Sequence, residues 1–226
     1  MLKRSFILFI CLLLRCPSES TLKISSFLDS SGIIVELKKP NLKKIVAEVV
    51  KIKGGRIGRI IEMLEGHSPG WRWVLKEGHL PDDVNGQSRL TSIGVLTTLD
   101  YRKLENASNL SIARTIIHEM VHAYLTLYFR YDQIRAIQDH PEIYKAWQRN
   151  QFADYNKIQH DEIEKTFLND IATALKEFGV KTKLQVANIV YSDLAWGGLD
   201  VKNSRLLTAL EKIRIQSRLI AEQSNR

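Results

Sequence analysis

The sequence predicts a mainly helical α+β domain with a small β-sheet. In seven segments, apolar residues recur at the spacing of an amphipathic helix. Only two short segments, residues 32–37 and 93–98, have the pattern typical of β-strands. With 44% hydrophobic and 26% charged residues, the composition is that of a globular protein and excludes a mainly disordered or fibrous chain.

The predicted elements follow one another without a linker long enough to divide residues 21–226 into two domains. The first two helices are expected at residues 41–52 and 57–64, with a Gly-Gly pair at residues 54–55 as the hinge between them. A turn-rich segment, residues 66–86, separates them from the strand at 93–98. The other helices are predicted at residues 110–128, 141–149, 159–178, 184–196 and 204–223. Asn109 can cap the first of these, and Gly179 can end the third.

The first 20 residues have the organisation of an export signal. Lys3 and Arg4 precede an apolar run over residues 6–14, and small or polar residues follow it. The run is shorter than the about 20 residues needed to cross a bilayer, which excludes a polytopic membrane protein. We therefore expect a signal peptide at residues 1–20 and a secreted or periplasmic domain at 21–226. If the segment is retained, it would form a buried strand or helix of a cytoplasmic protein.

Cysteine and charge content narrow the function further. Both cysteines, Cys11 and Cys16, lie in the predicted signal, so the remaining domain has no thiol for a disulfide, a zinc finger or a nucleophile. Any metal would have to be held by histidines and carboxylates. The net charge is +8, and much of the excess lies in residues 38–59. Such a segment can bind nucleic acid or lipid headgroups but is more commonly a solvated helix face, so nucleic acid is an alternative partner that we do not favour.

Residues 118–122 read His-Glu-Met-Val-His, a pattern that indicates a metal-binding catalytic site. On a helix, His118 and His122 lie one turn apart on one face and can bind the same metal ion. Glu119 lies beside them without occupying a ligand position. In a zinc hydrolase such a glutamate takes a proton from the metal-activated water and passes it to the leaving amine. The flanking residues predict a mostly buried helix, where these polar groups would be unfavourable without a partner.

The third ligand has four candidates: His140, Glu142, His160 and Glu164. His160 begins a stripe with helical spacing and is expected in the first turn of the 159–178 helix, where the helix dipole favours a neutral imidazole. The stripe continues through Ile163, Phe167, Ile171, Ala174 and Phe178. Residues 125 and 128 are Leu and Tyr, so the extended metzincin pattern is absent.

The segment Ser111-Ile-Ala-Arg-Thr-Ile-Ile-His-Glu-Met-Val-His-Ala-Tyr-Leu125 resembles the metal-binding helix of SprT-like zinc metallopeptidases. The resemblance is greatest to the branch of secreted bacterial proteins and polymorphic-toxin C-terminal domains. It extends over about residues 85–205 through His140-Pro-Glu-Ile-Tyr-Lys-Ala-Trp147, Gln159-His-Asp-Glu-Ile163 and Leu194-Ala-Trp-Gly-Gly-Leu199.

This resemblance implies a zincin-like fold that holds one zinc ion on His118 and His122, with Glu119 as general base and a protein or peptide as substrate. The DNA-repair type takes its third ligand from a segment that would correspond to His140, whereas the secreted branch favours His160, which we predict. It also implies that strand 93–98 lines the cleft and pairs with the substrate. Two alternatives are kept: a DNA-associated SprT-like protease and a non-catalytic metal-binding interaction module.

Overall fold

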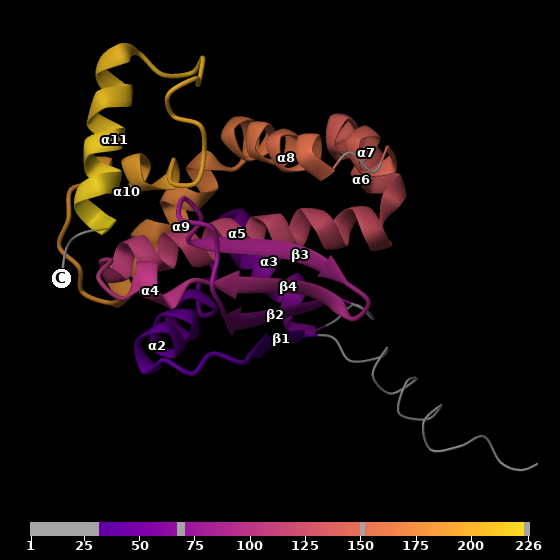
Figure 1. Ribbon diagram of the computed structural model, residues 1–226, viewed down its shortest axis with the longest axis horizontal. Coiled ribbons are helices and arrows are strands. Elements are labelled where there is room, and N and C mark those ends of the chain that lie inside the picture. Colours follow the sequence, from indigo (N-terminus) through magenta and orange to yellow (C-terminus); the bar gives the residue numbers. More distant parts are fainter. Residues whose placement is uncertain (1–31, 67–70, 150–151, 224–226) are drawn as a thin grey trace, which may run out of the picture.

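The computed structural model describes residues 32–66, 71–149 and 152–223, so the signal peptide predicted at residues 1–20 lies outside the described residues. A small sheet and a larger set of helices make up this part of the chain, which confirms the α+β class (Figure 1). No described helix is both long enough and apolar enough to cross a membrane.

The sheet has four strands in the order β1-β2-β4-β3. The strands are β1 (Gly32–Val35), β2 (Arg72–Glu77), β3 (Gly86–Thr91) and β4 (Gly94–Leu99). β1, β2 and β4 are parallel neighbours, and β3 pairs antiparallel with β4 through a tight hairpin. Since β3 ends the strand order, only one of its edges is paired within the described residues.

The longest helix, α5 (Asn109–Tyr131), is central to the fold. It packs against β3, β4, α2, α3 and α9, and nearly all of its residues are buried. In Figure 1 the sheet lies on one side of α5, and α6, α7 and α8 lie on the other. The remaining helices are α2 (Pro40–Val49), α3 (Gly55–Gly66), α4 (Tyr101–Leu104), α6 (Gln133–Asp139), α7 (Pro141–Gln148), α8 (Phe152–Thr166), α9 (Leu168–Lys181), α10 (Asn188–Ala195) and α11 (Ala209–Gln223).

Several predictions about local structure are wrong. Ser108, not Asn109, caps α5, because its Oγ accepts from the backbone N–H of Ser111 at 3.1 Å. The turn-rich segment 66–86 contains β2, whose first four residues are buried. Finally, α9 continues past Gly179, and the last two helices begin at residues 188 and 209 rather than 184 and 204.

The helix predicted over residues 159–178 is two helices, α8 and α9, that meet at Phe167. The stripe that predicted it is nevertheless buried from Ile163 onward. Because α8 begins at residue 152, His160 lies in the second half of that helix and not in its first turn. The helix dipole therefore does not account for its protonation state.

Candidate metal centre

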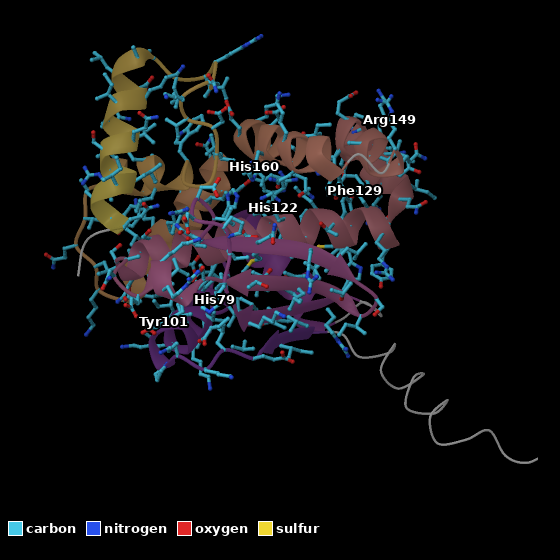
Figure 2. All side chains as sticks on the ribbon, in the orientation of Figure 1. His79, Tyr101, His122, Phe129, Arg149 and His160 are labelled. Carbon is cyan, nitrogen blue, oxygen red and sulfur yellow. The ribbon has the colours of Figure 1, made fainter. Side chains whose placement is uncertain are left out.

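Three histidines converge above α5. The Nε2 atoms of His118 and His122 are 3.0 Å apart, and the Nε2 atom of His160 lies 3.1 Å from that of His122. Two of these residues come from α5, while His160 comes from α8, which passes over it (Figure 2). The three ligand atoms all lie within 4.8 Å of one another, close enough to hold one metal ion.

The surroundings keep all three imidazoles neutral. Burial, together with the two neighbouring histidines and Arg114, holds the pKa of His118 well below its usual value. Burial also lowers the pKa of His122 to about 4, and burial with the nearby His122 lowers that of His160 to about 4. A neutral imidazole has a free lone pair, so the cluster is ready for a metal at neutral pH.

Gln159 fixes the orientation of one of these rings. His122 Nδ1 lies 2.7 Å from Gln159 Oε1, which can only accept, so Nδ1 carries the proton and Nε2 directs its lone pair to the cluster. The Gln159 amide in turn donates to the hydroxyl of Tyr155 at 3.0 Å. A buried amide that orders a histidine in this way is typical of the surroundings of metal ligands.

Glu119 lies beside the cluster in a buried position. Burial raises its pKa to about 7, an effect opposed by a hydrogen bond from Ser88 and by the positive charge of Arg114. The Ser88 hydroxyl donates to Glu119 Oε2 at 2.8 Å. A carboxylate with a pKa near neutrality is suited to accept and return a proton.

The hydroxyl of Ser88 belongs to a chain of hydrogen bonds through the sheet. Trp73 Nε1, which can only donate, lies 2.7 Å from Thr97 Oγ1, and Thr97 Oγ1 lies 2.6 Å from Ser88 Oγ. Because Ser88 gives its proton to Glu119, Thr97 must donate to Ser88. Donation thus runs in one direction, from Trp73 to the carboxylate of Glu119.

The histidines and Glu119 line a cleft of about 1030 Å³. Its walls are formed by β3 with the three residues 83–85 before it, by α5, α7 and α8, by the turn after α10 and by α11. The strand that lines the cleft is β3, so the expectation for residues 93–98 is wrong: β4 lies inside the sheet, paired on both edges. A Cβ at Gly86 would lie 2.8 Å from Glu119 Cγ, so this glycine lets β3 approach α5 closely.

Gly198 packs closely against the imidazole of His118. A Cβ at this position would lie 3.0 Å from Nε2 of His118, the atom that faces the other two histidines. Its φ of +91° also lies in a region that disfavours side chains. The turn after α10 can therefore pack this closely on the His118 ring only because residue 198 has no side chain.

The rival third ligands lie elsewhere. His140 is buried among aromatic rings, and its Nδ1 pairs with Glu162 at 2.7 Å. Glu142 is exposed and pairs with Lys145, while Glu164 accepts from the hydroxyl of Ser204 at 2.6 Å. The structure thus brings together His118, His122 and His160 but none of these three alternatives.

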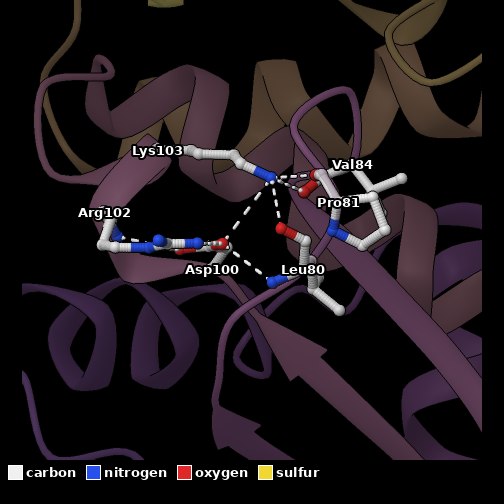
Figure 3. A network of polar contacts seen from close by, with 6 residues as sticks. All are labelled: Leu80, Pro81, Val84, Asp100, Arg102 and Lys103. Atoms are coloured by element: carbon white, nitrogen blue, oxygen red, sulfur yellow. Dashed lines mark hydrogen bonds and ion pairs between the residues drawn. The ribbon is translucent and has the colours of Figure 1, made fainter.

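A separate network fixes the segment that joins β2 to β3 (Figure 3). The side chain of Asp100 is fully enclosed, accepts from the backbone N–H of Leu80 at 2.9 Å and binds Arg102 through both carboxylate oxygens. Lys103 Nζ donates to the backbone carbonyls of Leu80, Pro81 and Val84. Because residues 83–85 line the cleft, this network shapes one part of its rim.

Sequence reasoning missed Ser88, Gln159 and Arg114 as parts of the site. The sequence did offer a reason to choose Gln159, since it precedes His160 in a segment that contributed to the family resemblance. Nothing in the sequence pointed to Ser88, because its contact with Glu119 joins residues 31 positions apart through the sheet. Comparisons of the chain with family models, with curated proteins and with solved structures found no match.

Proposed function

We propose that this chain is a zinc-dependent metallopeptidase with a zincin-like fold. The observation that carries the proposal is the convergence of three neutral histidines from two helices beside a buried glutamate. Three protein ligands with a fourth position left open are typical of catalytic zinc sites. A structural site, in contrast, usually has four protein ligands, and no fourth candidate joins the cluster among the described residues.

The three imidazoles and their spacing fit zinc. Around a tetrahedral zinc with Zn–N bonds of 2.0–2.1 Å, neighbouring nitrogens are about 3.3 Å apart. The observed Nε2 separations of 3.0 and 3.1 Å are close to this value. Zinc bound there would supply Lewis-acid chemistry, acidifying a water molecule and polarising a carbonyl group.

The protein's own residues would handle the proton. Glu119 accepts a proton from the attacking water and later delivers it to the amine that leaves when the peptide bond breaks. Ser88 holds the carboxylate through Oε2, which keeps the other oxygen available for this transfer. Gln159 holds His122 in the tautomer that a metal requires.

The shape of the cleft supports a peptide as substrate. Its volume of about 1030 Å³ is at the upper limit for small-molecule pockets, which are about 300–1,000 Å³. Along one wall runs β3, the end strand of the sheet, and an extended peptide can add to such an edge through main-chain hydrogen bonds. We also propose that the domain acts after export, as the composition of residues 1–20 and the resemblance to the secreted branch indicate.

The deciding experiment replaces Glu119 with Gln. We expect the E119Q protein to bind one zinc ion, measured by atomic absorption, and to lose hydrolysis of a general protein substrate such as casein by at least about 100-fold. E142Q is the matched control, because Glu142 is an exposed carboxylate outside the cluster.

Two outcomes would contradict the proposal. Unchanged hydrolysis by E119Q would refute the assigned base. A wild-type protein that binds zinc but hydrolyses nothing would favour the non-catalytic metal-binding module.

A further inference from the structure

The cleft contains a buried positive charge without a matching negative one. Arg114 lies on α5 one turn before His118, lines the cleft and is only 4% exposed. Within the described part of the chain, its guanidinium forms no ion pair, its Nε has no hydrogen-bond partner, and Nη2 makes one long hydrogen bond to Ser111 Oγ at 3.4 Å. Buried charges are normally paired, because an unpaired one is strongly unfavourable.

The carboxylate of Glu119 does not neutralise this charge. The two groups influence each other electrostatically, but they do not approach within ion-pair distance. Oε2 of Glu119 is also occupied by the hydroxyl of Ser88. Although burial lowers the pKa of Arg114 to about 10, the guanidinium stays charged at neutral pH.

Arg114 is placed next to the reacting centre. Four residues of α5, a rise of about 6 Å, separate it from His118. The turn after α10 covers both residues: a Cβ at Gly197 would lie 2.5–2.6 Å from three guanidinium atoms, and one at Gly198 would lie 3.0 Å from the imidazole of His118. The backbone of this turn thus packs directly against both side chains, and both also line the cleft, so one ligand in the cleft can touch both groups.

We propose that Arg114 binds a carboxylate of the substrate, so that the enzyme selects peptides with a negative charge within about two residues of the bond that is cleaved. This inference rests on the proposed function. The carboxylate is either an acidic side chain or the free C-terminus, because both present the same planar group to the guanidinium fork. Binding it would supply the counter-charge that Arg114 lacks.

The test uses zinc-loaded protein and three alanine hexapeptides. One is blocked at both ends, one has a free C-terminal carboxylate, and one is blocked but carries a central aspartate. We expect one or both charged peptides to be cleaved with a kcat/KM about 10- to 100-fold above that of the neutral one, the range expected for hydrogen bonds to a charged group. Which charged peptide is preferred distinguishes a C-terminal from an internal carboxylate.

Binding is measured separately by calorimetry on the zinc-loaded E119Q protein, so that cleavage does not interfere. The charged peptide should bind more tightly by a similar factor, and the added R114Q substitution should abolish the difference. Arg89 lines the same cleft from β3 and is exposed, so R89Q is the matched control and should keep the preference.

The outcomes separate this inference from the proposed function. If the wild type cleaves all three peptides equally, or if R114Q weakens the binding of all of them to the E119Q protein by the same factor, the carboxylate site is refuted while the peptidase stands. If the charged peptide binds preferentially but no peptide is cleaved, the peptidase is refuted while the carboxylate site stands. The comparison of peptides on the wild type keeps the test valid even if R114Q fails to fold.

Discussion

Replacing Gln159 with Leu tests how far the metal site depends on residues that do not touch the metal. Leu approximates the volume of Gln but offers no acceptor to His122 Nδ1, which is 2.7 Å from the Gln159 oxygen. Both residues are buried, so water cannot replace the lost partner without rearrangement. We expect Q159L to fold and to bind zinc more weakly than the wild type.

The size of the effect follows from the tautomers of His122. With zinc on Nε2, the proton must stay on Nδ1 and would be left unpaired, which costs about 1–3 kcal/mol for a buried donor. Without metal, the proton can move to Nε2, so the metal-free protein avoids most of this penalty. The difference lowers zinc affinity by about 10- to 100-fold, the range found when residues that orient metal-binding histidines are removed.

The assay is a competition for zinc against a chromophoric chelator at constant pH, which gives the ratio of dissociation constants. Q148L is the matched control: Gln148 lines the same cleft but is exposed, and its amide donates to Tyr144 instead of a histidine. A Q159L protein that binds zinc within threefold of the wild type would refute the role given to Gln159.

Three further predictions concern other parts of the site. Ser88→Ala removes a hydrogen bond that lowers the pKa of Glu119, so that pKa rises, and the acid limb of the pH–rate profile moves to higher pH while zinc affinity is unchanged. Gly198→Ala places a methyl group against His118 at an unfavourable φ, and we expect weaker zinc binding and a loss of about 1–3 kcal/mol of unfolding free energy. The pKa of Asp100 is held below its usual 3.8, so the ionised carboxylate stabilises the folded protein fully above about pH 4, and this stabilisation decreases as the pH falls. Asp100→Ala should therefore reduce the loss of unfolding free energy at acid pH, measured by chemical denaturation.

Each of these predictions has a matched control. Ser88→Thr keeps a hydroxyl and should restore the wild-type pH profile, so a profile that does not respond to Ser88→Ala would contradict the hydrogen-bond chain. Gly55→Ala has a positive φ but nothing within 4 Å, so it should lose stability without affecting zinc. If Asp83→Ala, at an exposed carboxylate, changed the acid dependence as much as Asp100→Ala, the assignment to the enclosed carboxylate would fail.

The parts of the site that depend on local geometry were predictable from the sequence. His118 and His122 lie four residues apart, and any helix brings such residues to one face. His160 could be chosen because the apolar stripe that follows it showed which side of the helix faces the interior. The break at Phe167 was not visible, because the backbone hydrogen bonds continue across it and no Gly or Pro marks it.

Contacts across the sheet could not be predicted in the same way. The strand β2 is buried and lacks the alternation that marks a half-exposed strand, so nothing in the sequence placed Trp73 beside Thr97. Without β2, the order of the strands cannot be predicted, and the expectation that residues 93–98 lie beside the cleft rests on the family resemblance alone. Ser88 could not be placed near Glu119 until the hairpin of β3 and β4 was known.

The position of His160 on α8 has a consequence for the mechanics of the domain. His122 and His160 are 38 residues apart, and α6, α7 and the first half of α8 lie between them. A metal ion shared by the two histidines would act as a cross-link between the ends of this segment. The cross-link would reduce the conformational entropy of all three helices. Amide hydrogen exchange after chelation should therefore accelerate in α6, α7 and α8 before it changes in the sheet.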